Sequence, residues 1–242
     1  MLRREIKIKP QAYTDPRPAE TMAPFHEWAR THEPGWTYAA VRVQLTPVAL
    51  LVSRTRGEGA RNVPRRGAVI LAPNHFSNMD HFFCGVFLRR QIRFMSKSQF
   101  FGGQPAISYL FRVSGHFPVR RGHADEEAFI NRSLGARARG VRWGLRRGWA
   151  VAHRRARRAA TGRGATGARD RRAVVPVAIH GSDAVRGWRR GRFPRVRVSY
   201  GELLRFDVVP APSRDKQLEA AQAIFARVRA QYAELAGSPQ AG

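Results

Sequence analysis

The sequence contains a single cysteine, Cys84, among 242 residues. One thiol excludes an internal disulfide framework and a metal cluster held by several thiolates. The eight histidines show no spacing typical of metal ligands, so no metal ion is expected at a functional site. Cys84 lies in a segment that is expected to be helical, where a small buried thiol is its expected state.

Acidic residues are also scarce: 17 Asp and Glu stand against 44 Lys and Arg, which gives a net charge of +27. This balance predicts an anionic partner such as phospholipid headgroups, nucleic acid or an acidic carrier protein. No helix-turn-helix or zinc-finger pattern is present, and basic charge alone gives only nonspecific, salt-sensitive binding to nucleic acid. A nucleic-acid-binding protein is therefore the weaker alternative, and no specific nucleic acid is expected as a partner.

Long apolar runs are absent. Residues 36–52 have apolar residues at helical spacing with Pro47 as a kink, but Arg42 and Gln44 interrupt them, and about 20 apolar residues are needed to span a bilayer. Two interpretations stay open: a helix in the membrane interface with Trp36 and Tyr38 at headgroup level, or a helix packed on its own domain. The charged N-terminus has no apolar core after it, so a cytoplasmic location is expected.

The most informative stretch is A-V-I-L-A-P-N-H-F-S-N-M-D-H-F-F, residues 68–83. Its apolar beginning, residues 68–72, has the length and bulk of a buried parallel strand. A helix is expected to follow and to continue to Arg90, with Ser77 and Asn78 as good N-cap residues. Asp80 then lies in the first helical turn, where a carboxylate is favoured.

His75 lies at the end of the expected strand, five residues before Asp80. Because the chain turns between them, the carboxylate can reach the ring, accept the Nδ1 proton and fix the tautomer. Nε2 could then take a proton from a substrate hydroxyl, and such general-base assistance supplies roughly 10²–10⁴ in rate. The open alternative is that His75 only caps a loop and Asp80 only caps a helix.

The string N-H-F-S-N-M-D resembles the first motif, His-x4-Asp, of the glycerolipid acyltransferases, the 1-acylglycerol-3-phosphate acyltransferase family. The resemblance runs from about Arg56 to Phe206. It implies an α/β fold with a mixed, largely parallel sheet flanked by helices, as in glycerol-3-phosphate acyltransferases. It further implies transfer of an acyl group from acyl-CoA or acyl-carrier protein to the hydroxyl of a lysophosphatidate-like acceptor, with no bound cofactor. His75 would be the general base and Asp80 its orienting partner, with Asn74 and Ser77 at the substrate.

The string P-V-R-R-G, residues 118–122, is similar to the second family motif and places the family's phosphate-binding arginine at Arg121, with Arg120 in the variable position. Arginine's planar fork suits phosphate oxygens, so Arg120 and Arg121 are both expected to bind the acceptor phosphate. The third motif, Phe-Pro-Glu-Gly-Thr-Arg, is missing: residues 153–172 are Arg-rich and without glutamate, and read as a loose basic loop. A compensated frameshift and true divergence both remain open, and so does a catalytically impaired family member. The fourth motif, valine-rich around Pro176, is present in residues 173–181.

These patterns divide the chain into an N-terminal extension with the interfacial or packed helix (1–55), an acyltransferase domain (56–207) and a C-terminal helix with a tail (208–242). A peripheral position on the inner face of the cell membrane, in contact with its phospholipids, is expected. Residues 1–34 are expected to be an extension lying over the surface. The remaining expected strands cover residues 92–95, 116–119, 148–152, 173–181 and, as a half-exposed edge strand, 195–200. The remaining expected helices are 106–113, 125–147 and one capped by Ser213, with a core-facing stripe that begins at Leu218 and continues to Leu235.

Overall fold

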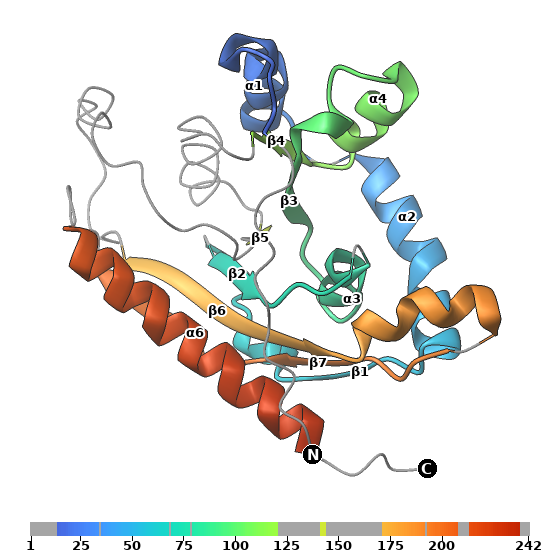
Figure 1. Cartoon of the computed structure of the whole chain (residues 1–242), viewed down its shortest axis with the longest axis vertical. Coiled ribbons are helices and arrows are strands. Elements are labelled where there is room, and N and C mark those ends of the chain that lie inside the picture. The colour runs from blue at the N-terminus through green and yellow to red at the C-terminus, as the bar shows by residue number, and fades with distance from the viewer. Residues whose placement is uncertain are drawn as a thin grey trace.

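The computed structural model of the chain describes residues 14–33, 35–67, 69–77, 79–120, 141–143, 171–191, 193–207 and 213–237. Within these ranges one mixed β-sheet is covered by helices (Figure 1). The strands are β1 (Arg56–Glu58), β2 (Val69–Pro73), β3 (Ile92–Lys97), β4 (Phe117–Val119), β5 (Val141–Trp143), β6 (Arg171–His180), β7 (Arg197–Tyr200) and β8 (Leu204–Asp207). The α-helices are α1 (Ala23–Thr31), α2 (Trp36–Pro47), α3 (Asp80–Val86), α4 (Pro105–Val113) and α6 (Arg214–Gly237). Short 3-10 helices cover Ala19–Met22, Ala60–Asn62, Ser98–Phe100 and Ser182–Arg190.

The strand order is β1-β7-β6-β2-β5-β3-β4, with β8 paired to β6. Strand β2 is parallel to both of its neighbours, β5 and β6, and β3 is parallel to β4 and β5. Only β7 and β8 run antiparallel to β6. The expected α/β fold with a mixed, largely parallel sheet is therefore confirmed.

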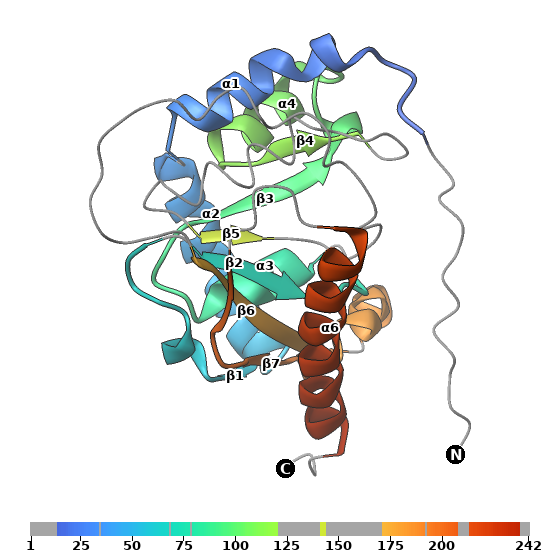
Figure 2. The same cartoon turned by 90° about the vertical axis from the view of Figure 1, so that its left-hand side faces the viewer.

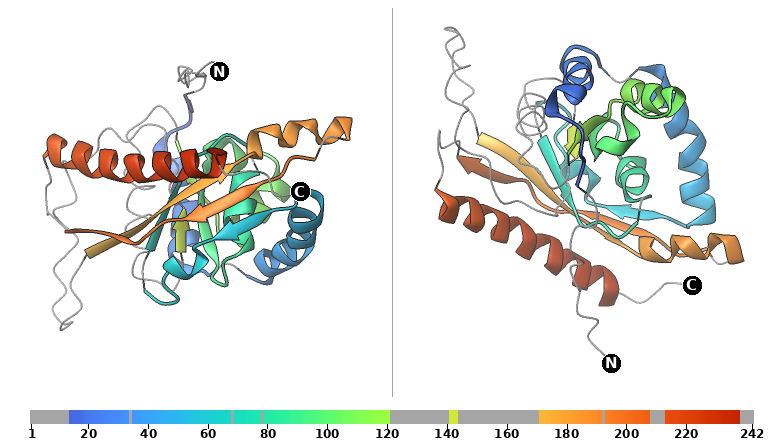
Figure 3. Two further views of the ribbon diagram at one scale, coloured as in Figure 1. Left: turned by 90° about the horizontal axis from the view of Figure 1, so that it is seen from below. Right: turned by 45° about the horizontal axis from the view of Figure 1, so that its top comes forward.

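The central strand β2 is buried on both faces, as its uninterrupted apolar sequence predicts. Val69 and Leu71 point to the main core, whereas Ile70 and Ala72 pack on the opposite face against Ile224 and Val228 of α6 and their neighbours. Side chains alternate between the two faces of a strand, so β2 joins both layers. Figure 3 shows α6 running along one face of β6 and β7.

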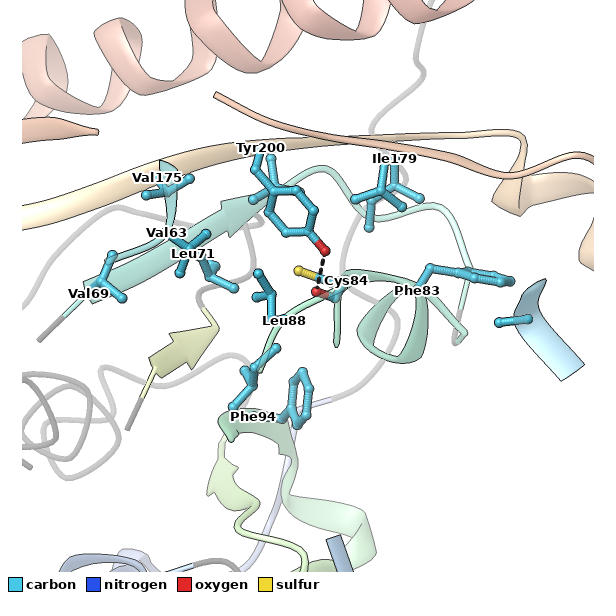
Figure 4. Packing of buried hydrophobic residues seen from close by; sticks show 14 of the residues in the cluster. Val63, Val69, Leu71, Phe83, Cys84, Leu88, Phe94, Val175, Ile179 and Tyr200 are labelled. Carbon is cyan, nitrogen blue, oxygen red and sulfur yellow. Dashed lines mark hydrogen bonds between the residues drawn. The ribbon is translucent and has the colours of Figure 1, made fainter. Parts of the chain in front are cut away.

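The main core lies between the sheet and α3 and includes the predicted buried thiol. Cys84 is fully buried, and its carbonyl oxygen accepts a hydrogen bond of 2.8 Å from the Tyr200 hydroxyl (Figure 4). Burial raises the pKa of Tyr200 well above its usual value, so the hydroxyl stays protonated and donates. This bond ties α3 to β7 across the core.

The N-terminal segment is more ordered than its sequence indicated. Helix α1, which was not expected, lies beside β4 and α4 (Figure 2), and its Ala29 packs on Phe117. The side chain of Arg93, a residue of β3, donates to the carbonyl oxygens of Ala29 and His32. Arg17 donates to the carbonyl oxygens of Phe101 and Ser98 and pairs with the buried Asp15. Polar contacts to main-chain oxygens therefore hold this segment, and such contacts leave no apolar periodicity in the sequence.

Helix α2 ends at Pro47 and continues as one π-helical turn, Val48–Val52, as the expected kink implies. The prediction that Tyr38 lies at headgroup level is wrong. Tyr38 is buried, and its hydroxyl oxygen accepts a hydrogen bond of 3.1 Å from the Ile92 N–H. Trp36 is 80% exposed. No helix in the described part of the chain has the length and apolar character needed to cross a membrane.

Several expected elements are corrected by the sheet. Residues 141–143, expected to be helical, form β5 between β2 and β3; the other residues of that expected helix, and the expected strand 148–152, lie outside the described residues. Strand β7 is not an edge strand, because β1 pairs with its outer side, and three of its four residues are buried. Strand β6 begins at Arg171, inside the expected basic loop.

Two helices also differ from expectation. Helix α3 ends at Val86 rather than at Arg90, and Met79 occupies its N-cap position without a side-chain cap. Ser213 does cap α6, since its Oγ accepts a hydrogen bond of 3.3 Å from the Lys216 N–H. Leu218, expected in the core-facing stripe, is 54% exposed, and Ile224 is buried instead.

Candidate active site

The candidate site forms where the carboxyl ends of the parallel strands β2 and β6 lie together. The Asn74 side chain, directly after β2, bonds the main chain of β6 in both directions. Its Nδ2 donates to the Ile179 carbonyl oxygen at 2.7 Å, and its Oδ1 accepts from the Ile179 N–H at 2.6 Å. Asn74 was expected at the substrate; in the structure its amide fixes the path of the chain into His75.

The predicted contact between His75 and Asp80 is present. The Nδ1 atom of His75 lies 2.8 Å from Oδ2 of Asp80, and the two side chains are 25% and 0% exposed. The acid is therefore buried while the ring reaches the surface of the site. Because a carboxylate accepts the hydrogen bond, Nδ1 carries the proton and Nε2 carries the lone pair.

Asp80 also organises the main chain around the histidine. The same Oδ2 atom accepts hydrogen bonds of 2.7 Å from the N–H groups of both Phe76 and Ser77. Three donors on one oxygen hold the carboxylate in a single orientation. The turn between β2 and α3 is thus built around the acid, which explains why an acidic side chain is buried here.

The main-chain N–H groups at the start of α3 are used within the turn. The Met79 N–H donates to Ser77 Oγ at 3.2 Å, and the Asp80 N–H donates to the Ser77 carbonyl oxygen at 3.1 Å. Ser77 likewise shapes the turn through both its hydroxyl and its main chain. Asn78 lies outside the described residues.

Helix α6 reaches the same end of the sheet. The Tyr232 ring lies 5.7 Å from that of Phe76 and 5.2 Å from that of His180, measured between centroids. Burial, with a contribution from Arg197, lowers the pKa of His180, so this ring is neutral at neutral pH. The sequence indicated only a core-facing stripe on α6, because local periodicity does not reveal which strand end a helix reaches.

An apolar pocket of about 130 Å³ runs along α3, immediately after Asp80. Its walls are predominantly apolar and come from α2, α3, β3 and α4; among them are Val41, Leu45, Phe82, Val86, Phe94 and Leu110. His81 and His116 also line it. No local pattern in the sequence indicated that these two histidines share a cavity.

Of the two arginines expected at the acceptor phosphate, Arg120 lies within the described residues. Nη2 of Arg120 donates to the Arg17 carbonyl oxygen at 2.6 Å, so this guanidinium contacts the N-terminal segment. Arg121 lies outside the described residues, as does residue 153 onward up to β6. Of the region similar to the family's second motif, the structure therefore describes the residues up to Arg120. Most of the region in place of the third motif lies outside the described residues.

Comparison with known proteins agrees with this arrangement. An acyltransferase family model matches residues 54–142, and no curated protein matches. The crystal structure of the 1-acyl-sn-glycerophosphate (LPA) acyltransferase PlsC from Thermotoga maritima shares the fold, with a TM-score of 0.50 and 17% identity over 90% of each chain. The matched residues include β2, His75 and Asp80. Residues 54–142 thus match the acyltransferase family, and the chain shares the fold of PlsC.

Proposed function

We propose that this acyltransferase moves a fatty acyl group from the thioester of acyl-CoA or acyl-carrier protein to the hydroxyl of a lysophosphatidate-like acceptor. The observation that carries the proposal is the 2.8 Å contact between His75 and the buried Asp80. It lies at the carboxyl end of β2, and the residue after Asp80 lines an apolar pocket. A thioester donor needs space for an apolar chain, and an alcohol acceptor needs a base.

In the proposed reaction Nε2 of His75 removes the proton of the acceptor hydroxyl as its oxygen attacks the thioester carbonyl carbon. The tetrahedral intermediate then expels the thiolate, which takes the proton from the imidazolium. Asp80 stays ionised, holds the Nδ1 proton and stabilises the imidazolium. The acyl group ends on the acceptor oxygen and the proton on the thiol sulfur, and no covalent acyl-enzyme is formed.

The acyl chain is proposed to lie in the pocket along α3. His81, the residue after Asp80 in the first turn of α3, lines the pocket, so a thioester held near His75 would direct its chain toward this cavity. Burial of methylene groups in such a pocket contributes about 0.8 kcal/mol each. Arg121, at the position of the family arginine, is proposed to hold the acceptor phosphate, and Arg120 to hold the N-terminal segment beside it.

We further propose that α2 and α4 contact the membrane from which the acceptor comes. The two helices are joined by the hydrogen bond of 3.1 Å from the Gly35 N–H to the Val113 carbonyl oxygen, and they lie side by side in Figures 1 and 2. With the π-helical turn after α2, they expose large apolar side chains, namely Trp36, Val43, Leu51, Ile107, Tyr109 and Leu110. Exposed apolar side chains on a strongly basic protein suit an anionic lipid surface.

The test is an assay of the purified full chain with radiolabelled lysophosphatidate and oleoyl-CoA, beside His75→Ala. A matched control is His32→Ala, because His32 is an exposed histidine stacked on Trp28, away from the site. Diacylated product from the wild type and from His32→Ala, but not from His75→Ala, supports the proposal. Equal product from all three would overturn it.

A second candidate is a family member that has lost turnover, and the Arg-rich residues 153–172 in place of the third motif favour it. In that case wild-type protein binds vesicles of anionic phospholipid but forms no product with any donor. Salt-sensitive retention on DNA without vesicle binding would instead favour a nucleic-acid-binding role.

A further inference from the structure

The C-terminal helix α6 contacts the turn that carries His75 through one aromatic side chain. The Tyr232 ring meets the Phe76 ring edge to face, with 5.7 Å between the centroids and an angle of 61° between the planes. Phe76 directly follows His75, and its N–H donates to Oδ2 of Asp80 at 2.7 Å. The residue that Tyr232 contacts is therefore itself part of the main chain that orients the acid.

The same tyrosine also contacts the strand beside this turn. Its ring lies 5.2 Å from the ring of His180, the last residue of β6. His180 follows Ile179, whose main chain is joined to the Asn74 side chain by two hydrogen bonds. His75 thus lies between two connections to β6, one made by the residue before it and one made through Tyr232 by the residue after it.

Other residues of α6 hold the helix on the sheet. Ile224 and Val228 are buried in the apolar cluster that β2 forms with this helix. Nε2 of Gln231 donates to the Ser199 carbonyl oxygen of β7 at 3.3 Å. Because these contacts are independent of the Tyr232 ring, loss of the ring should leave the helix in place.

We infer that Tyr232 is a positioning residue for the acyl transfer, because its ring holds Phe76 and thereby the orientation of His75. The inference rests on the proposed function, in which Nε2 of His75 is the general base. Phe76 is 38% exposed, so its ring adds little to the core, and its contact with Tyr232 restricts the turn instead. Burial, with a contribution from Asp183, raises the pKa of Tyr232, so the phenol is neutral at physiological pH and acts through the contact of its ring.

The expected effect has the size of one aromatic pair, which changes the population of a held conformation by roughly two- to tenfold. Tyr232→Ala removes the pair, so kcat for transfer from oleoyl-CoA to lysophosphatidate should fall by this factor. The KM values should stay unchanged, because the substituted side chain acts on the base and not on substrate binding. Tyr232→Phe keeps the ring and should keep the wild-type kcat.

Hydrogen exchange gives a second readout that does not depend on turnover. The N–H groups of Phe76 and Ser77 both donate to Oδ2 of Asp80. In Tyr232→Ala these two amides should exchange roughly two- to tenfold faster than in the wild type. In Tyr232→Phe they should exchange as in the wild type.

The matched control is Ile224→Ala, which removes a buried side chain of the same helix away from the turn. It should lower the free energy of unfolding in denaturant without changing kcat or the exchange of the two amides. Phe76→Ala should lower kcat as Tyr232→Ala does, and the double variant should be no slower than the slower single variant, because one contact is removed in all three.

The inference would be overturned by wild-type kcat in Tyr232→Ala, by equal effects of Ile224→Ala, or by losses that multiply in the double variant. An equal loss in Tyr232→Phe would also overturn it, since the ring would then not be the group that acts. If the wild type itself forms no product, the proposed reaction fails. The exchange of the Phe76 and Ser77 amides then still decides whether Tyr232 holds the turn.

Discussion

Asn74 and Ile179 are joined by a pair of hydrogen bonds, of 2.7 Å to the carbonyl oxygen and 2.6 Å from the N–H of Ile179. The Asn74 side chain thus makes the two main-chain hydrogen bonds with β6 that a neighbouring strand residue would make. His75 follows immediately, so the position of its ring depends on this clamp. A second contact, 3.3 Å from the Asn74 N–H to the Val177 carbonyl oxygen, fixes the same residue to β6.

Substitution Asn74→Ala is expected to lower both stability and turnover. Loss of the amide leaves a main-chain donor and a main-chain acceptor of Ile179, itself fully buried, without this partner, at a cost of about 1–3 kcal/mol. Displacement of His75 lowers kcat with little change in KM. Denaturant unfolding and steady-state kinetics measure the two effects. The isosteric Asn74→Asp keeps an acceptor for the N–H and should fall between; wild-type values for Asn74→Ala would contradict the clamp.

The exposed apolar surface of α2 and α4 predicts membrane partitioning. Trp36→Ser combined with Leu51→Ser, at side chains that are 80% and 77% exposed, should weaken binding to vesicles of anionic phospholipid at least tenfold, since each buried large apolar side chain contributes about 1.5–3 kcal/mol. Sedimentation with vesicles gives the partition coefficient. The control is Leu218→Ser, because Leu218 is 54% exposed on α6, away from α2 and α4 (Figure 1). An equal effect of the control would refute this surface as the contact.

The buried His116 predicts a specific sensitivity to acid. Its pKa is about 3 in the folded chain, against the ordinary value of 6.5, so the unfolded state binds a proton first as the pH falls. Because the fold keeps the ring neutral, His116 does not change the free energy of unfolding above pH 6.5. Below that pH it lowers the free energy of unfolding increasingly, by about 2–3 kcal/mol at pH 4.5. His116→Phe, which does not titrate, should lose less stability than the wild type between pH 7.5 and 4.5 in denaturant unfolding. Equal losses would mean that the ring is protonated in the fold.

The core of the site was predictable because it is local. A short apolar strand, a turn and an acid in the first turn of a helix fixed the expectation that His75 meets Asp80, and five residues suffice for the contact. The prediction failed where side chains of the turn were assigned by preference alone. Ser77 and Asn78 are residue types that favour N-cap positions. In the structure Asp80 Oδ2 accepts the hydrogen bonds from the Phe76 and Ser77 N–H groups, and Met79 is the N-cap residue.

Non-local pairing explains the other differences. Strand β7 alternates like an edge strand in sequence, yet Arg197 pairs in parallel register with Arg56, which lies 141 positions earlier in the chain. Local periodicity carries no information about such a distant partner. Residues 141–143 form β5 by pairing with β2 on one side and β3 on the other, and both partners are distant in the sequence. Helix α3 ends early, and Arg90 beyond it donates to the carbonyl oxygens of Pro64 and Gly67.

The pocket could not be predicted from the sequence, because its walls also come from segments that are distant in the chain. Tyr38 and Phe111 reach one cavity from α2 and α4, which are far apart in the chain. Their apolar spacing predicted helices correctly but not which faces enclose a space.

The most direct test of the central claim is a double-mutant cycle of His75→Ala and Asp80→Asn, read as kcat/KM for transfer from oleoyl-CoA to lysophosphatidate. Asp80→Asn keeps the shape of the turn but removes the carboxylate that holds the Nδ1 proton, so each single variant should lose roughly 10²–10⁴-fold. Because Asp80 is proposed to act through His75, the double variant should be no slower than His75→Ala alone. Losses that multiply in the double variant would show that the two side chains act independently and would contradict the account.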